Sequence, residues 1–383
     1  MSVTFPKGFL AAGISAGLKS SGAKDLALVV NSGPLKSAAA RFTSNRVKAA
    51  PVLWSEQVLQ DGRVDAVILN SGGANACTGS EGFLDVHRTA EFVSDLLGVS
   101  ATDIAVCSTG LIGVRLPMDR ILQGASLAHG ELSRAGGFDA AVAIMTTDTV
   151  SKTFEIESDG VRVAGMAKGA GMLAPSLATM LAVITTDAMV DPKVLDGILG
   201  EVVEHTFNRI DSDGCTSTND TVLLLASGAS AIEMPERQLR EMVSTVCQNL
   251  ARQLVADAEG VSKEVEITVI NAVSESDALE VGRACARNNL LKCAIHGEDP
   301  NWGRVLAAVG TTSAVFEPQQ VDVSFNGITL CRGGSIGDDR ILVDMTGRIV
   351  EIIIDLNAGT SSATIWTNDL TAEYVHENSA YSS

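Results

Sequence analysis

The sequence predicts an α/β protein with layered mixed sheets and flanking helices. Short runs rich in β-branched residues alternate with longer amphipathic runs, which is the pattern of strands connected by helices. The 383 residues are 46% hydrophobic and only 4% aromatic, so most of the apolar content is Ala, Val, Leu and Ile. A chain of this length can bury a large core, and it fits two domains or one large layered unit.

Segments of strand character recur along the whole chain. They are short, rich in Val, Ile and Leu, and bounded by polar or glycine-containing stretches. The segment IVEIIIDL and others like it, set among helical runs, indicate mixed strand directions. In chain order the predicted strands are 26–31, 66–70, 104–108, 152–157, 161–166, 181–186, 221–227, 264–272, 321–326 and 349–356.

Helices are predicted from their start signals. Proline at a first helical position loses no needed N–H group, and a preceding Asp or Ser accepts from the free N–H groups. Neither a heptad pattern nor a fixed-period repeat is present, and no Pro/Ser-rich linker divides the chain. Three helices are predicted within 117–136, 191–210 and 235–260, opened by Pro117, by Asp191 and Pro192, and by Pro235. A fourth is predicted over 277–288, with Ser276 as its cap.

The charge balance argues against nucleic acid and membranes as partners. The chain has 28 basic and 46 acidic residues, a net charge of −18. A surface of that sign repels phosphate backbones and anionic lipid. No cluster of Lys and Arg interleaves with aromatic residues, so we expect no nucleic-acid interface.

Cysteine and histidine spacing argues against disulfides and metal. The seven cysteines are an odd number with no CxxC pair, and the five histidines show no HxxxH spacing. The start of the chain has Lys7 as its only early positive charge and is broken by glycines, unlike a signal peptide. We therefore expect a reduced, cytoplasmic protein without a metal.

The longest uncharged run, residues 169–186, is about as long as a membrane span. It contains Pro175 and several threonines, which predict a buried loop that leads into a core strand. Its first residues, 169–174, match GxGxxA, a weak dinucleotide signal because proline follows where a helix should continue. No P-loop pattern occurs.

Glycine-rich polar clusters follow several predicted strands. Glycine allows backbone conformations that direct N–H groups at an anion or oxyanion, although tight turns are the simpler explanation for any one cluster. The clusters are NSGGANACTG (70–79), CSTGLIG (107–113), IMTTDT (144–149) and the segment 165–181.

Thr179 is the unusual residue of the uncharged run. A threonine hydroxyl is a poor nucleophile without a base, but a threonine at the start of a chain can use its own α-amine. That chemistry would require a cut between Ala178 and Thr179. On the residues alone, a buried threonine that approaches a strand is the commoner interpretation. No GxSxG elbow and no glycosidase-like carboxylate pair occur.

The segment KGAGMLAPSLATML (168–181) resembles the self-cleavage motif of the glutamate N-acetyltransferase family, also called ornithine acetyltransferases, of the cyclic arginine pathway. Further blocks resemble that family in the expected order, so the resemblance covers essentially the whole chain. Besides the clusters at 70–79, 107–113 and 144–149, they are STNDT (217–221), DAEG (257–260), DPNWGRV (299–305) and ENSAYSS (377–383).

The resemblance implies a self-cleaving acyltransferase. The precursor is expected to cut itself between Ala178 and Thr179 into an α fragment, 1–178, and a β fragment, 179–383. The fragments are expected to stay associated, as a dimer of αβ units or a higher oligomer. Thr179 then takes acetyl from N-acetylornithine and passes it to glutamate. Some members also accept acetyl-CoA as donor, and no cofactor is expected. The implied fold is shared with self-cleaving aminopeptidases.

The resemblance also implies roles for individual residues. Thr109 and Gly110 match the oxyanion-hole pair, although a tight turn after a strand would also explain them. Taken alone, Lys168 could be a solvated turn residue, and Glu259 could be a charge at a helix end. His296 and Trp302 are expected to be structural. The implied substrate-binding residues are Thr146, Lys168, Thr179, Glu259, Asn378 and the last residue, Ser383.

Two rival functions remain open from the sequence. One is an N-terminal-nucleophile amidohydrolase or aminopeptidase of the same fold, in which water takes the acyl group; relatives of that kind resemble serine enzymes, and Thr179 argues against it. The other is an uncleaved binding or scaffold protein of this fold. Formation of acetylglutamate rather than acetate, and two fragments rather than one, distinguish the alternatives.

Overall fold

The computed structural model describes residues 1–174 and 180–380. Its described residues form two compact units. The first contains Met1–Asn208 and Cys215–Asp257, and the second contains Arg209–Gly214 and the chain from Ala258 onward. The predicted division at 178/179 concerns cleavage fragments rather than compact units, and both of its flanking residues lie outside the described residues, so it stays a prediction.

The first unit contains two mixed sheets. In the four-stranded sheet, of order β1-β2-β4-β5, only β4 and β5 are parallel. In the five-stranded sheet, of order β3-β9-β8-β7-β6, only β8 and β9 are parallel. The strands are β1 Phe9–Ile14, β2 Leu26–Asn31, β3 Ser37–Phe42, β4 Ala66–Ser71, β5 Ile104–Thr109, β6 Lys152–Ser158, β7 Val161–Lys168, β8 Leu181–Thr186 and β9 Thr221–Ala226.

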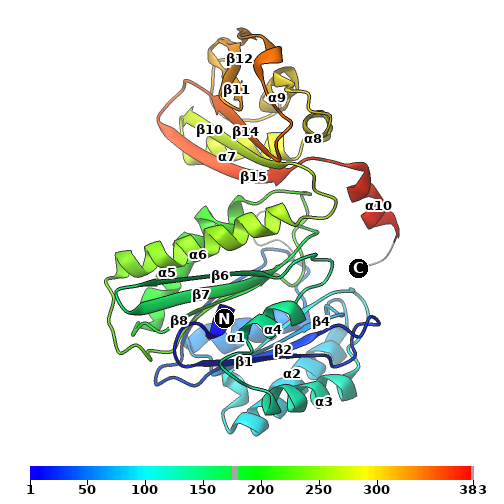
Figure 1. Ribbon diagram of the computed structural model, residues 1–383, viewed down its shortest axis with the longest axis vertical. Helices are drawn as coiled ribbons and strands as arrows, with labels where there is room; N and C mark the ends of the chain where they lie inside the picture. The colour runs from blue at the N-terminus through cyan, green and yellow to red at the C-terminus, as the bar shows by residue number, and fades with distance from the viewer. Residues whose placement is uncertain (175–179, 381–383) are drawn as a thin grey trace. The chain divides into compact units, whose positions relative to one another are not determined.

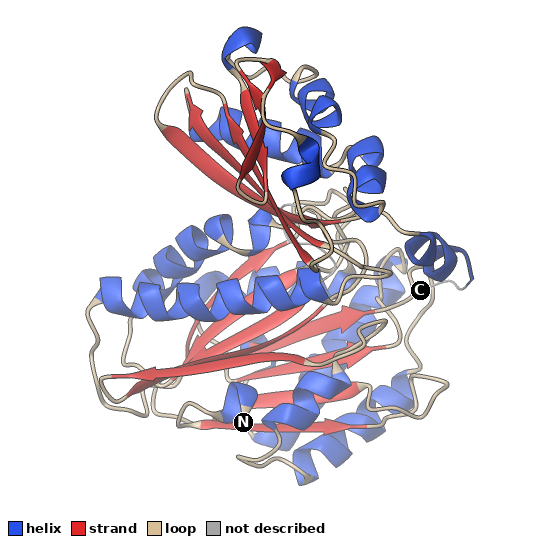
Figure 2. Ribbon diagram, turned by 45° about the horizontal axis from the view of Figure 1, so that its top comes forward, coloured by secondary structure: helices blue, strands red, loops and turns tan. Residues whose placement is uncertain are grey.

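Helices cover the outer faces of both sheets. The helices α5 and α6 lie on the five-stranded sheet, and α2 and α3 lie on the four-stranded sheet (Figures 1 and 2). The first unit is therefore a four-layer α/β/β/α arrangement. Its helices are α1 Ala50–Val58, α2 Gly79–Leu97, α3 Met118–Gly130, α4 Gly137–Ala143, α5 Pro192–His205 and α6 Glu236–Ala256.

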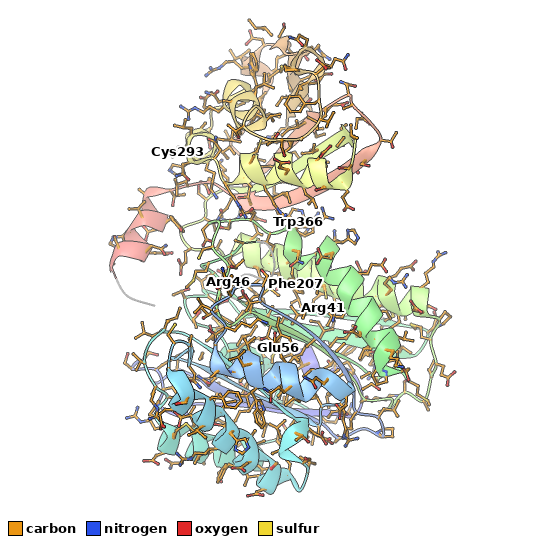
Figure 3. The ribbon with its side chains drawn as sticks, turned by 180° about the vertical axis from the view of Figure 1, so that it is seen from behind. Arg41, Arg46, Glu56, Phe207, Cys293 and Trp366 are labelled. Atoms are coloured by element: carbon orange, nitrogen blue, oxygen red, sulfur yellow. The ribbon has the colours of Figure 1, made fainter. Side chains whose placement is uncertain are left out.

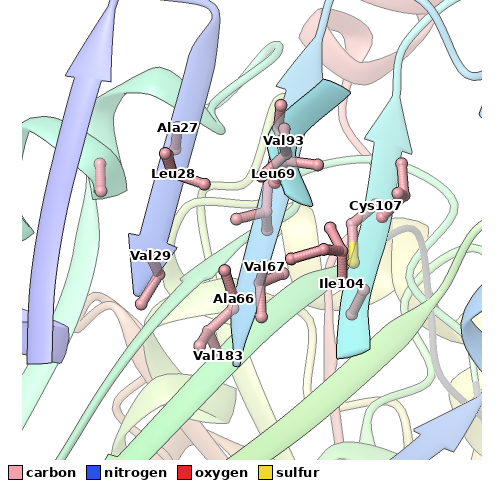
Figure 4. Close-up of a cluster of buried hydrophobic side chains, with 14 of the residues drawn as sticks. Ala27, Leu28, Val29, Ala66, Val67, Leu69, Val93, Ile104, Cys107 and Val183 are labelled. Carbon is pink, nitrogen blue, oxygen red and sulfur yellow. The ribbon is translucent and has the colours of Figure 1, made fainter. Parts of the chain in front are cut away.

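The main core lies where the two sheets of the first unit meet face to face. Val183 of β8 belongs to the same buried cluster as Val67 of β4 and Ile104 of β5 (Figure 4). Successive side chains of a strand point to opposite faces, so alternate residues of β8 fill this core while the others face α5 and α6. Each such side chain stabilises the fold by about 1.5–3 kcal/mol.

The second unit contains one six-stranded mixed sheet, of order β13-β12-β11-β14-β10-β15. Only β10 and β14 are parallel, and α7 packs on β10 and β15. Its strands are β10 Glu264–Ala272, β11 Asp322–Phe325, β12 Ile328–Arg332, β13 Ser335–Ile336, β14 Ile349–Asp355 and β15 Ser361–Asn368. Its helices are α7 Glu275–Ala286, α8 Asn289–His296, α9 Trp302–Val309 and α10 Ala372–Ala380.

The structure confirms the predicted fold class, and each predicted strand is present within a few residues. One helix start is wrong. Ser274, not Ser276, caps α7, because its hydroxyl oxygen accepts from the backbone N–H of Asp277 at 3.1 Å. Only Ser274 has an acidic residue three positions later, which is the capping-box spacing.

None of the seven cysteines, all of which the structure describes, forms a disulfide bond, and Cys293 on α8 is one of the exposed ones (Figure 3). Within residues 1–174 and 180–380, three or more His, Cys, Asp or Glu side chains nowhere gather as a metal site would need. A search of the same residues finds no helix that is both long and apolar enough to cross a membrane.

Candidate active site

The turn after β5 carries the predicted oxyanion donors. Thr109 ends β5, and Gly110 follows with φ +125°, a region that side chains rarely adopt. A Cβ atom on Gly110 would lie 2.6 Å from the backbone nitrogen of Gly73, so glycine is required for the close approach. The Gly73 N–H also donates to the Thr109 carbonyl at 3.0 Å. The turn is therefore held firmly against the loop that follows β4.

Lys168 contacts the hydroxyl of Thr109. Lys168 ends β7, and its Nζ lies 3.2 Å from Thr109 Oγ1. Both side chains are almost wholly buried, at 1% and 2% exposure. An ammonium group only donates hydrogen bonds, so the Thr109 oxygen accepts from Lys168. The Thr109 hydroxyl hydrogen is thereby directed away from Lys168 and remains able to donate to another acceptor.

Asp148 connects Lys168 with Thr146. Its carboxylate accepts from the backbone N–H of Gly169 at 2.7 Å and from that of Thr146 at 2.9 Å. It also pairs with the buried Lys152 at 2.6 Å, and Lys152 in turn pairs with Asp257 at 2.6 Å. Two predicted substrate-binding positions are thus tied to one buried carboxylate.

The charge of Asp148 is set by its surroundings. Burial raises the pKa of this carboxyl, but the Lys168 and Lys152 charges and the donated hydrogen bonds outweigh burial and lower the pKa to about 2. Asp148 is therefore ionised at neutral pH. The resulting row of alternating buried charges compensates the ammonium of Lys168 next to Thr109.

The residues on either side of the predicted cut, Ala178 and Thr179, lie outside the described residues, as does Ser383. The next residue, Met180, is described, and its N–H donates to Asp220 Oδ1 at 3.0 Å. Its carbonyl accepts from the N–H of Thr221 at 3.1 Å. Burial raises the pKa of Asp220 well above its usual range, although the N–H groups of Met180 and Ser217 oppose that rise.

Two more predicted substrate-binding residues contact each other in the second unit. Asn378 Nδ2 donates to Glu259 Oε2 at 2.9 Å. Gly260, with φ +62°, makes this contact possible, because a Cβ atom there would lie 2.2 Å from the backbone nitrogen of Tyr374 on α10. The helix α10 therefore lies directly on the turn that contains Glu259.

His296 is not placed for acid–base relay. Its Nδ1 faces Asp369 Oδ2 at 2.9 Å and Ser262 Oγ at 3.1 Å. A Ser-His-Asp relay requires the hydroxyl and the carboxylate on opposite ring nitrogens, so this cluster lacks that geometry. Trp302 packs against the core of the second unit. The first element that the structure describes after the GxGxxA match is the strand β8, which begins at Leu181.

The structure brings Thr109, Gly110, Lys168 and, through Asp148, Thr146 together in the first unit. It brings Glu259 and Asn378 together in the second. Three polar residues that hold these positions were not predicted from the sequence. They are Asp148, Asn219 and Asp220, which lie in the blocks IMTTDT and STNDT. The signal available in the sequence was an acidic or amide side chain beside a buried strand.

Comparison with known proteins agrees with the resemblance seen in the sequence. The family model described as "ArgJ family" matches residues 10–383. The chain is 63% identical over 383 residues to the "Arginine biosynthesis bifunctional protein ArgJ" of Streptomyces coelicolor, with full coverage of both chains. It is 60% identical over 382 residues to the protein of the same name from Thermobifida fusca, again with full coverage.

Two solved structures are also similar. One is ornithine acetyltransferase from Mycobacterium tuberculosis complexed with ornithine, 59% identical, with a TM-score of 0.45 over 46% of this chain and 96% of that chain. The other is the arginine biosynthesis bifunctional protein ArgJ from Bacillus halodurans, 31% identical, with a TM-score of 0.48 over 51% of this chain and 97% of that chain. On the full-length sequence matches, the chain belongs to the ArgJ family.

Proposed function

We propose that this protein transfers the acetyl group of N-acetylornithine to glutamate by way of an acetyl-Thr179 intermediate. The observation that carries the proposal is the buried contact between Lys168 Nζ and Thr109 Oγ1, at 3.2 Å, beside the backbone of Gly110. It prepares two hydrogen-bond donors on one turn, as the oxyanion of acyl transfer requires. Membership of the ArgJ family supplies the reaction in which these donors act.

The reaction proceeds in two half-reactions. The Thr179 hydroxyl attacks the acetyl carbonyl while the Thr179 α-amine accepts the hydroxyl proton. The C–N bond breaks, ornithine leaves with that proton, and the acetyl group stays on Thr179 as an ester. The glutamate amine then attacks the ester and gives a proton to the Thr179 α-amine. The C–O bond breaks, and the α-amine passes this proton to the Thr179 oxygen. Both tetrahedral oxyanions receive hydrogen bonds from the Thr109 hydroxyl and the Gly110 N–H.

Lys168 adds an electrostatic contribution to these donors. Its hydrogen bond polarises the Thr109 hydroxyl, which strengthens the hydrogen bond that Thr109 donates to the oxyanion. Each oxyanion donor is worth about 3–4 kcal/mol in comparable acyl-transfer sites. We assign Thr146, Glu259, Asn378 and Ser383 to substrate binding, as the resemblance implies. The proposed reaction needs no cofactor, and the use of acetyl-CoA as a second donor is part of the test below.

We further propose that Thr179 becomes available by self-cleavage after Ala178. The strand pairing supports continued association of the fragments 1–178 and 179–383. Strand β7 of the first fragment pairs with β8 of the second over Val163–Lys168, and β3 pairs with β9. Cleavage of one peptide bond leaves these ladders intact. The working unit that we propose is a cytoplasmic dimer of αβ pairs.

The test is to incubate the purified protein with N-acetylornithine and glutamate and to measure acetylglutamate, ornithine and free acetate. We expect acetylglutamate and ornithine in equal amounts, with acetate below one tenth of the product. A parallel reaction with acetyl-CoA in place of N-acetylornithine determines whether it is a second donor. If acetate equals ornithine with glutamate present, the protein is a hydrolase instead.

A further inference from the structure

The turn before β9 contacts both halves of the catalytic apparatus. All four residues of this turn, Ser217–Asp220, are polar and buried, and no step of the proposed reaction uses the side chains of Asn219 and Asp220. Asn219 contacts the backbone of Ser108, next to the turn of Thr109 and Gly110, which we call the oxyanion turn. Asp220 contacts the backbone of Met180, the residue after the proposed nucleophile. One short segment therefore contacts two parts of the chain that are distant in sequence.

Asn219 holds the oxyanion turn through hydrogen bonds to backbone carbonyls next to it. Its Nδ2 donates to the carbonyl of Ser108 at 2.8 Å and to the carbonyl of Ala74 at 2.6 Å. Ser108 directly precedes Thr109, and Ala74 follows Gly73, whose backbone touches Gly110. Both hydrogens of the amide are used, and the carbonyls are buried. The position of the oxyanion turn therefore depends on this side chain.

Asp220 fixes the start of β8. Its Oδ1 accepts from the N–H of Met180 at 3.0 Å, and its Oδ2 accepts from the N–H of Ser217 at 3.1 Å. The side chain is completely buried. Met180 directly follows Thr179 in the chain, so this hydrogen bond holds the residue adjacent to the nucleophile.

The turn itself is held on both sides. The hydroxyl of Thr43 donates to the Ser217 carbonyl, and the N–H of Thr43 donates to the Asp220 carbonyl at 2.9 Å. The N–H of Asn219 donates to Ser217 Oγ at 3.1 Å. Since Asn219 and Asp220 are neighbours on a constrained backbone, a shift of one alters the position of the other.

We propose that Asn219 and Asp220 are positioning residues for the reaction: Asn219 fixes the backbone beside the oxyanion donors, and Asp220 fixes Met180, the residue that follows the proposed nucleophile in the chain. This inference rests on the proposed function and deepens it. A misplacement of about 1 Å in a catalytic group can cost about 10²-fold in rate. The same geometry serves the self-cleavage step, which passes through an oxyanion at the Ala178 carbonyl.

Asn219→Asp tests the first contact and has a matched control. The variant keeps the side-chain size and the hydrogen bond from Thr218 Oγ1 to Oδ1, but it loses both donated bonds. Asn31→Asp is the control, because Asn31 Nδ2 also donates to two backbone carbonyls, those of Leu35 and Ala226. Ala226 is at the opposite end of β9, away from the oxyanion turn.

Asp220→Asn tests the second contact, because an amide has one acceptor oxygen where the carboxylate has two. Asp187→Asn is its control. Asp187 is equally buried, follows the far end of β8, and accepts one backbone N–H on each oxygen, from Lys7 at 3.0 Å and from Arg162 at 2.8 Å. Each pair of variants therefore makes the same chemical change at the two ends of one strand.

The readouts are kcat per acetylatable site, KM for both substrates, the rate of self-cleavage and Tm. We expect Asn219→Asp and Asp220→Asn to lower kcat about 10- to 100-fold, to change KM less than about threefold, and to slow cleavage. Both controls should lower Tm by a similar amount while kcat per site stays within about twofold. If Asn219→Asp does not fold, Asn219→Ser, which keeps one smaller donor, is expected to show an intermediate loss of kcat.

The positioning role would be overturned if folded Asn219→Asp and Asp220→Asn had the kcat of the parent. It would also be overturned if the two control variants lost as much kcat as these two. The parent protein is measured in every arm. A parent that forms no acetylglutamate would refute the proposed function, whereas an active parent beside unaffected variants would refute the positioning role alone.

Discussion

Replacing Asp148 with Asn removes the central negative charge of the buried row at the active site. The carboxylate pairs with Lys152 at 2.6 Å, is stabilised by the charge of Lys168, and accepts the N–H of Gly169. The amide variant has one acceptor oxygen and no charge, so it leaves two buried ammonium groups less well compensated. We expect Asp148→Asn to destabilise the fold and to lower kcat through displacement of Lys168.

The magnitude follows from the pKa and from burial. A carboxyl whose pKa falls from 3.8 to about 2 on folding contributes about 2 kcal/mol when ionised. Because the folded-state pKa is lowered, this stabilisation is complete above pH 3.8 and is lost as the pH falls toward 2. Removing one member of a buried pair costs about 3–5 kcal/mol, and Lys152 keeps Asp257 as a partner. We expect a loss of about 2–4 kcal/mol at neutral pH.

The assay is urea unfolding at pH 7 in a double-mutant cycle with Lys152→Met. The control is a cycle on Arg237 and Glu241, an ion pair with the same sequence spacing whose side chains are 87% and 63% exposed. We expect a coupling energy of about 2 kcal/mol or more for the buried pair and at most about 0.5 kcal/mol for the exposed pair. Equal coupling energies in the two cycles would refute the reasoning.

Three further changes test other parts of the structure. Thr109→Ala should lower kcat about 10²–10³-fold with little change in KM, and Thr109→Ser should restore most of it, whereas a rise in KM alone would contradict the oxyanion role. Gly260→Ala should displace α10 and raise KM about tenfold, because its Cβ would lie 2.2 Å from Tyr374 N, while Gly98→Ala, also at positive φ but with open space, should only lower stability by about 1 kcal/mol. Burial raises the pKa of Asp211 to about 6, although the charge of Arg287 opposes this rise. The free energy of unfolding of the parent should therefore fall by about 2 kcal/mol, relative to that of Asp211→Asn, as the pH rises from 3.8 to 6. Parallel curves of unfolding free energy against pH for the two proteins would contradict this.

The strands that the sequence predicted are those whose apolar residues are most continuous. The strands β2, β8 and β10 match their predicted ranges because both of their faces, or one complete face, are buried. Five strands were not predicted: β1, β3, β12, β13 and β15. Of these, β1 and β3 consist largely of alanine and glycine, which carry little strand signal without the sheet they join. Strand order depends on contacts between distant segments and was not predictable from local pattern.

The site was predictable only in part, and for a related reason. Thr109, Lys168 and Glu259 came from family motifs, which show that a residue type is required but not what holds it. Asp148 and Asn219 act through hydrogen bonds to the backbone of residues far away in the chain. Nothing in local spacing reveals such bonds, so these two roles required the structure.

The most direct test of the central claim is the mass of the β fragment after exposure to N-acetylornithine without glutamate. We expect one added acetyl group, located on the peptide that begins at Thr179. We expect its loss when glutamate is added, with acetylglutamate formed in equal amount. A protein that makes acetylglutamate while this peptide never gains mass, even after rapid quenching, would contradict the acetyl-Thr179 intermediate.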